Sequence, residues 1–168
     1  GRMLAQLALA HPQLRYFGLD LSPYYVSHAK HKLQHVTDLS LVTGNAESMP
    51  WRDGFFDVIT SVHLFHELPP KARTNVYREM WRALRPGGLL VIQDSAQLSD
   101  SAELGYFLER FSKEFHEPYH AGYMRDDIGE ALTAAGFEVV SSEPCFVSKV
   151  VVAHKPLQSR ADAPNATP

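Results

Sequence analysis

Apolar residues recur along the chain with two different spacings, which alternate from one segment to the next. Three short apolar runs, rich in aromatic and β-branched residues, predict buried strands at residues 14–20, 39–43 and 55–62. Helical spacing predicts a helix over the first ten residues and another from about residue 22 to residue 35. Strands that alternate with helices indicate an α/β fold with a mostly parallel sheet and right-handed crossovers.

The middle of the chain contains the most regular helical pattern. Val76, Met80 and Leu84 belong to one apolar stripe, which predicts a helix that Pro86-Gly87-Gly88 ends. The elements expected around it are a helix in the link 45–50, a strand at 89–92, an aromatic helix at 104–115, an irregular segment at 116–124, a helix from an Asp126 cap to Ala135, and strands at 137–142 and 146–154. The last two strands are close enough in sequence to pair as an antiparallel hairpin.

Composition and charge exclude several classes of protein. The chain has 168 residues, 45% hydrophobic and 21% charged, which is typical of one ordinary globular domain. A net charge of −3 gives no reason to expect nucleic acid or an anionic membrane as a partner. The single cysteine, Cys145, cannot close an internal disulfide, so a cytoplasmic protein is expected. Residues 157–168 lack the apolar content for packing and predict a disordered tail.

Polar residues follow two of the predicted strands, where open α/β sheets bind their ligands. Asp20 ends the first strand, and its carboxylate can accept two hydrogen bonds from a ribose diol or can cap the helix that follows. Asn45 and Ala46 follow the next strand and can present an amide and a backbone N–H to an adenine edge, or form a simple turn.

Three longer segments, taken with these residues, carry a family resemblance: GNAESMPWRDGFFDVITSVHLFHEL at 44–68, REMWRALRPGGLLVIQD at 78–94 and AGFEVV at 135–140. In this order and spacing they resemble the class I S-adenosylmethionine-dependent methyltransferases, particularly the small-molecule enzymes related to quinone biosynthesis. The resemblance covers residues 1–156 as one domain and implies a Rossmann-like sandwich whose last strand is antiparallel. It implies S-adenosylmethionine as the cofactor, in-line methyl transfer to a small organic acceptor, and a substrate-covering insertion at residues 95–124.

The same resemblance implies which residues contact the cofactor: Gly1, Asp20, Leu21, Asn45, Ala46, Ser61 and Val62. Asp20 matches the acid that holds the ribose, and Ser61 and Val62 match positions near the methionine part. Asn45 departs from the family, which usually has an acid at this position facing the adenine. The family's first strand and most of its glycine-rich loop are expected before Gly1, so we expect an N-terminally truncated fragment that binds the cofactor weakly.

Histidines are the candidate general bases for an acceptor hydroxyl, while an amine or an activated carbon need not require a base. The candidates are His63 and His66 after the strand at 55–62, and His120 in the irregular segment. Each can equally be a packed or solvent-facing histidine. The substrate-contacting residues expected from the same irregular segment are His116, Glu117, Tyr119 and Tyr123.

The sequence offers three other interpretations: a metal site, a dehydrogenase and a binding module without catalysis. Neither the histidines on the predicted helix at 22–35 nor the group His63, His66 and Glu67 matches the HExxH zinc arrangement, so no metal site is expected. A nicotinamide-dependent dehydrogenase also has an acid after its second strand, so Asp20 does not separate it from a methyltransferase. A methyltransferase-like binding module without catalysis stays a third alternative.

Overall fold

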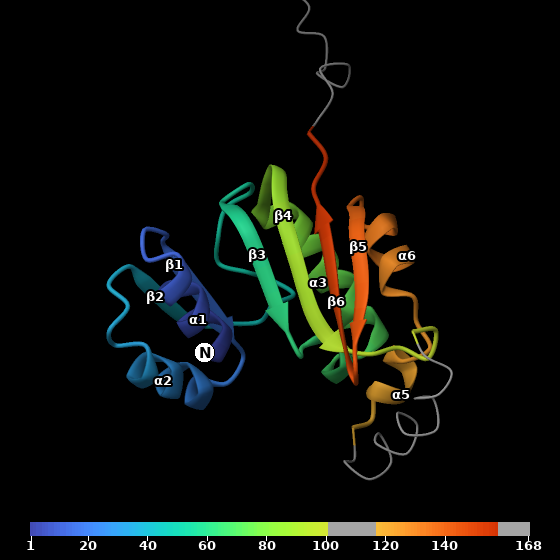
Figure 1. The fold of residues 1–168 in the computed structure, drawn as a ribbon, viewed down its shortest axis with the longest axis horizontal. Coiled ribbons are helices and arrows are strands. Elements are labelled where there is room, and N and C mark those ends of the chain that lie inside the picture. The colour runs from blue at the N-terminus through green and yellow to red at the C-terminus, as the bar shows by residue number, and fades with distance from the viewer. Residues whose placement is uncertain (101–116, 158–168) are drawn as a thin grey trace, which may run out of the picture. The chain divides into compact units, whose positions relative to one another are not determined.

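The structure is a computed structural model that describes residues 1–100 and 117–157 (Figure 1). The chain divides into two compact units, Gly1–Pro50 and Trp51–Pro168. Among the described residues, no helix is long and apolar enough to cross a membrane. The predicted aromatic helix at 104–115 lies outside the described residues, as does the predicted tail at 157–168 apart from residue 157.

The first unit contains two helices and a parallel pair of strands. Its elements are α1 (Arg2–Ala10), β1 (Tyr16–Asp20), α2 (Pro23–Lys32) and β2 (Leu39–Thr43), as the sequence predicted. The strands pair in register from Tyr16 opposite Leu39 to Asp20 opposite Thr43. Helix α2 begins where Ser22 accepts a hydrogen bond from the Tyr25 backbone N–H. Asp20 and Asn45 therefore lie at and just beyond the carboxyl ends of the two strands.

Close packing holds this small unit together. The hydroxyl of Tyr16, which is 8% exposed, donates a hydrogen bond to the carbonyl of Leu7 or of His11, at 2.8 and 2.9 Å, and so ties β1 to α1. Gly18 is required because a Cβ atom there would lie 2.5 Å from the Leu41 side chain and 3.1 Å from that of Leu4.

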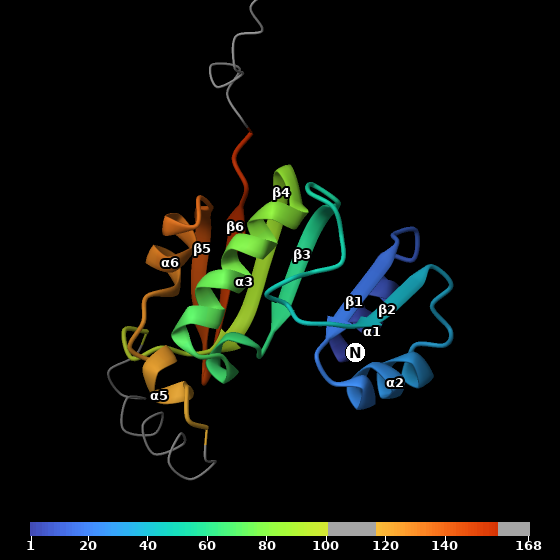
Figure 2. The same ribbon diagram turned by 180° about the vertical axis from the view of Figure 1, so that it is seen from behind.

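The second unit contains a mixed sheet with the strand order β3-β4-β6-β5. Its elements are β3 (Phe56–Val62), η1 (Phe65–Glu67), α3 (Pro70–Ala83), β4 (Leu84–Ser95), α5 (His120–Tyr123), α6 (Ile128–Ala134), β5 (Glu138–Cys145) and β6 (Ser148–His154). Strands β3 and β4 are parallel, whereas β6 is antiparallel to both β4 and β5, which confirms the predicted hairpin. Helix α3 crosses one face of the sheet (Figure 2), where Trp81 contacts Phe137 edge to face.

The boundary between α3 and β4 differs from the prediction. The helix ends at Ala83, and the Pro86-Gly87-Gly88 turn belongs to the beginning of β4 rather than to the end of the helix. The cause is a strand partner far away in sequence: the Gly87 N–H donates to the Lys155 carbonyl, and the Lys155 N–H donates to the Gly88 carbonyl. Gly87 accommodates this geometry with a φ of +74°.

Three smaller predictions were wrong. Residues 45–50 form a turn and not a helix, because the Asn45 side chain accepts a hydrogen bond from the Glu47 N–H and the Asn45 carbonyl accepts one from the Ser48 N–H. The segment predicted to be irregular contains the short helix α5. Helix α6 is capped by Asp127, whose side chain accepts from the Glu130 N–H, and not by Asp126.

Candidate active site

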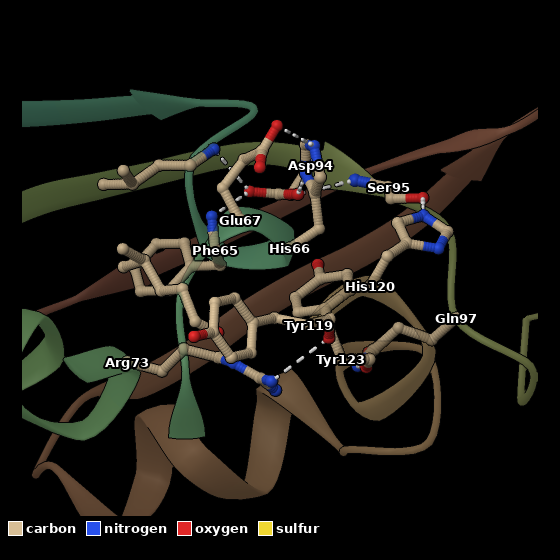
Figure 3. Close-up of polar contacts among 12 residues, drawn as sticks. Phe65, His66, Glu67, Arg73, Asp94, Ser95, Gln97, Tyr119, His120 and Tyr123 are labelled. Carbon is tan, nitrogen blue, oxygen red and sulfur yellow. Dashed lines mark hydrogen bonds and ion pairs between the residues drawn. The ribbon is translucent and has the colours of Figure 1, made fainter. Parts of the chain in front are cut away.

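A buried histidine–aspartate pair lies at the carboxyl ends of β3 and β4 (Figure 3). His66 Nδ1 and Asp94 Oδ1 are 2.5 Å apart, and the Asp94 side chain is 1% exposed. Asp94 Oδ2 accepts hydrogen bonds from the backbone N–H groups of Leu64 and Phe65, at 3.0 and 2.7 Å. These two backbone amides therefore hold the carboxylate in position independently of its contact with the imidazole.

Local structure explains why His66 faces this carboxylate. The parallel strands β3 and β4 end at the same edge of the sheet, and His63 continues their ladder through its N–H to the Gln93 carbonyl. A φ of +50° at His63 then turns the chain out of β3 into η1. Phe65, which is fully buried, stacks on Tyr77 of α3 with ring centroids 4.4 Å apart and anchors η1.

The two members of the pair change each other's acidity. Burial lowers the pKa of the His66 imidazole, but the hydrogen bond and the negative charge of Asp94 raise it above its ordinary value overall. Burial raises the pKa of Asp94, but the hydrogen bond from His66 and those from two backbone amides hold it below its ordinary value overall. The pair therefore favours an ionised carboxylate beside a histidine that binds a proton readily.

A second histidine lies beside this pair. His120, on α5, is 1% exposed, and its Nε2 is 2.9 Å from the Ser95 hydroxyl. Its ring centroid is 5.6 Å from that of His66. Burial and the neighbouring His66 charge lower the pKa of His120, so the two imidazoles have opposite shifts.

Two buried polar groups hold the segment that carries His120. Arg73 of α3, 3% exposed, donates from Nε to the Leu68 carbonyl, pairs with Asp126 and reaches the Tyr119 carbonyl. Gln97 donates to the carbonyls of Tyr123 and Asp126, and its own Oε1 accepts from Lys149 Nζ at 3.0 Å.

The structure brings together most of the predicted catalytic and substrate residues. The His63 and Tyr123 rings lie 5.8 and 6.4 Å from the His66 ring, and an oxygen of Glu117 lies within 4.8 Å of a His66 nitrogen. Tyr119 differs, since it is 41% exposed and its contact with Arg73 uses the backbone carbonyl. His116 lies outside the described residues.

Sequence reasoning missed Asp94, Ser95, Arg73 and Gln97. Asp94 lies near the end of β4 and belongs to a segment that had already been singled out for the family resemblance. Like Asp20, it is an acid near the carboxyl end of a strand, where open α/β sheets bind their ligands. Arg73 offered no such signal, because an arginine on an amphipathic helix is normally solvated.

Among the residues that the structure describes, two sets of side chains have the composition of a cation site: His63, His66 and Asp94, and His66, Glu67 and Glu117. In the first set, both Asp94 oxygens already accept hydrogen bonds from the protein. In the second set, Glu67 Oε1 lies 3.7 Å from His66 Nε2, and an oxygen of Glu117 lies within 4.8 Å of a His66 nitrogen.

Comparison with known proteins identifies the family. Residues 1–92 match the model of the methyltransferase domain family. The chain belongs to this family. It is 30% identical over 139 residues to an uncharacterized methyltransferase of Synechocystis sp., with 81% of this chain and 62% of the relative covered. It is 29% identical over 152 residues to a demethylmenaquinone methyltransferase of Geobacillus stearothermophilus, with 79% and 64% covered.

The chain thus spans less than two thirds of the length of these relatives. Among solved structures, it resembles a putative methyltransferase in a complex with the Haloferax volcanii Trm112 activator, with a TM-score of 0.73 and 21% identity over 93% of this chain and 78% of that one. This likeness supports the Rossmann-like α/β fold of the methyltransferase. Family membership decides against the dehydrogenase alternative and indicates S-adenosylmethionine as the cofactor.

In the first unit of the methyltransferase, the residues predicted for the cofactor are accessible. Asp20 is exposed, and its Oδ1 accepts a hydrogen bond from the Ser22 N–H at 2.8 Å, which is the alternative local role that the sequence allowed. Leu21 is 72% exposed. Asn45 is exposed and uses its Oδ1 within its own turn, beside the half-buried Ala46. Gly1 precedes α1 and packs near Ala29.

In the second unit, Ser61 and Val62 lie at the end of β3. Ser61 is 6% exposed, and its Oγ is buried without a hydrogen-bond partner among the described residues. A buried hydroxyl of this kind fits a polar ligand group, because an unsatisfied one costs about 1 to 3 kcal/mol. Val62 is 39% exposed and so remains available for contact. Ser61 and Val62 therefore fit the contact with a polar ligand that the sequence predicted for them.

Proposed function

We propose that this methyltransferase transfers a methyl group to an O–H or N–H group of a small organic acceptor, with His66 as the general base. The observation that carries the proposal is the 2.5 Å contact of His66 Nδ1 with the buried carboxylate of Asp94. S-adenosylmethionine, when bound, supplies a methyl carbon attached to a positively charged sulfur. Positioning of the acceptor provides most of the acceleration in such a displacement.

The contact with Asp94 determines which nitrogen of His66 can act. A carboxylate at Nδ1 stabilises the tautomer with its proton on that atom, which leaves the lone pair on Nε2. Nε2 is then the atom that accepts the acceptor's proton, and Asp94 is a positioning residue that stabilises the resulting imidazolium. A general base of this kind is worth about 10² to 10⁴ in rate.

The remaining predicted site residues have supporting roles in this proposal. His120 is held neutral by burial, next to Ser95, and is a second candidate for proton transfer. His63 is exposed, and its ring lies 5.8 Å from that of His66. The proposed acceptor contacts are His116, Glu117, Tyr119 and Tyr123, and the proposed partner is a small molecule rather than nucleic acid or a membrane.

The proposed cofactor contacts are divided between the two compact units. Gly1, Asp20, Leu21, Asn45 and Ala46 belong to the first, and Ser61 and Val62 belong to the second. Among the described residues, no strand pairs with both sheets. We propose, as the sequence predicted, that the 168-residue chain binds S-adenosylmethionine weakly, and a micromolar dissociation constant by calorimetry would contradict this.

The general base is tested with His66→Gln. We expect S-adenosylhomocysteine formation, measured with a panel of small phenols and amines, to fall about 10²- to 10⁴-fold in kcat. The dissociation constant of S-adenosylmethionine should stay unchanged, because His66 contacts the acceptor. His31→Gln, at an exposed position of α2, is the matched control. Turnover of His66→Gln equal to that of the unmodified protein would remove His66 from the mechanism.

A further inference from the structure

Two carboxylates, of Glu67 and Glu117, lie beside the proposed base. Glu67 Oε1 lies 3.7 Å from His66 Nε2, and one oxygen of Glu117 and one of Glu67 lie within 4.8 Å of each other and of a His66 nitrogen. His66 Nδ1 is occupied by Asp94, and Nε2 is the nitrogen that lies 3.7 Å from Glu67. The base is therefore surrounded by carboxylates on the side where the acceptor has to bind.

Within the part of the chain that the structure describes, the only cation beside these two glutamates is His66 when it is protonated. Glu117 Oε2 is buried there and accepts no hydrogen bond. No lysine or arginine of the described ranges forms an ion pair with Glu67 or Glu117. Burial raises the pKa of Glu117, as expected for a carboxylate that has lost water without gaining a donor. A ligand that supplies hydrogen-bond donors and positive charge would satisfy these groups.

The sign of this charge distinguishes between an oxygen and a nitrogen acceptor. A hydroxyl that loses its proton becomes an anion, which two neighbouring carboxylates repel. A neutral amine that attacks a methyl group acquires positive charge on nitrogen as the bond forms. Carboxylates placed beside that nitrogen stabilise the transition state, because they face the charge that develops there.

We propose that the acceptor is a small amine whose nitrogen binds between Glu67 and Glu117, next to Nε2 of His66. The inference rests on the proposed function and narrows its acceptor to one class. The nitrogen forms a bond to the methyl carbon with its lone pair, and the carbon–sulfur bond breaks with both electrons going to sulfur. An acceptor bound as its ammonium ion first gives a proton to His66 Nε2, which restores this lone pair, and the product leaves as the methylated ammonium ion.

A binding experiment without the cofactor tests the recognition step. Benzylamine and benzyl alcohol have the same ring and differ in charge, so calorimetry at pH 7 with EDTA present compares them directly. We expect benzylamine to bind at least about tenfold more tightly than benzyl alcohol, because a charge-assisted hydrogen bond contributes about this much affinity. Glu117→Gln should remove this preference. Glu143→Gln, which removes the same charge at an exposed position of β5, should leave it unchanged.

Two results would overturn the inference. Equal affinity for the amine and the alcohol would show that the carboxylates do not select positive charge. Amine binding that appears only when zinc or manganese is added, and disappears with EDTA, would assign the His66, Glu67 and Glu117 cluster to a metal ion instead. Near-ultraviolet circular dichroism of both glutamate variants confirms that each has retained its tertiary structure.

A second measurement separates this inference from the proposed function. Tyramine contains both an amine and a phenol, and mass spectrometry of its product with S-adenosylmethionine identifies the methylated atom. An N-methyl product that His66→Gln suppresses supports both proposals. An O-methyl product overturns the amine assignment and retains the methyl transfer. Selective benzylamine binding without any methylation of either compound contradicts the proposed function but leaves the amine site in place.

Discussion

The pKa of His66 depends mainly on Asp94, and the charges of Glu117 and Glu67 raise it further. Its pKa is raised although burial alone would lower it, because Asp94 contributes a hydrogen bond and a negative charge. A general base has to be unprotonated to act, so activity should rise with pH through a value above that of an ordinary histidine, about 6.5.

Asp94→Asn tests this dependence at the scale of a single residue. The amide keeps the size of the carboxylate but removes its charge, so burial dominates and the pKa of His66 falls. The rise in kcat should move to lower pH, while the maximum kcat decreases because the imidazolium is less stabilised. A pH–rate profile measures both effects. A profile that keeps its midpoint in Asp94→Asn would contradict the assignment of His66 as the base.

At the scale of the secondary-structure elements, Arg73 joins three parts of the site. It lies on α3, contacts the Leu68 carbonyl after η1, and holds Tyr119 and Asp126 on either side of α5. Its guanidinium also lies 5.7 Å from the centre of the Tyr123 ring. Because η1 carries His66 and α5 carries His120, Arg73 determines how the two histidines face each other.

We expect Arg73→Met to loosen α5 and not to unfold the sheet. The change should lower the free energy of unfolding by about 1 to 3 kcal/mol, as for loss of hydrogen bonds to a charged group. It should also reduce kcat more than it changes the KM of the cofactor. Arg78→Met, at an exposed position of the same helix, is the control for charge. Denaturant titration and steady-state kinetics are the measurements, and equal effects of the two variants would contradict this role.

At the scale of the whole molecule, the chain contains two sheets that share no strand pairing among the described residues. Each sheet has its own packing: Gly18 against Leu41 in the first unit, and Phe65 against Tyr77 in the second. A defect placed in one sheet is therefore expected to act mainly on that sheet.

Gly18→Ala tests this independence. The added Cβ would lie 2.5 Å from the Leu41 side chain, so we expect a local destabilisation of about 1 to 3 kcal/mol. Amide hydrogen exchange should become faster within residues 1–50 and stay unchanged in β3, β4, β5 and β6. Ser40→Ala, at an exposed position of β2, is the control. Equal acceleration in both units would show that they unfold as one.

Local pattern was sufficient to predict the strands and most of the helices. Strands β1, β2 and β3 and helices α1 and α2 follow from apolar spacing, and the C-terminal hairpin follows from two β-rich runs separated by a short link. The family resemblance of the segments around β3 and β4 is likewise a property of the sequence, and the family match confirms it. These features depend on residues near one another in the chain, so the sequence by itself determined them.

Contacts between distant residues decided the rest. His66 and Asp94 are 28 positions apart, and Arg73 and Asp126 are 53 apart. The spacing of apolar residues along the chain does not predict such pairs. They form only when the fold brings distant segments together. The end of α3 was misplaced for the same reason, since Lys155 extends the ladder at Gly87 and Gly88. Tertiary structure alone therefore decided which histidine is held by a buried carboxylate, and with it the candidate base.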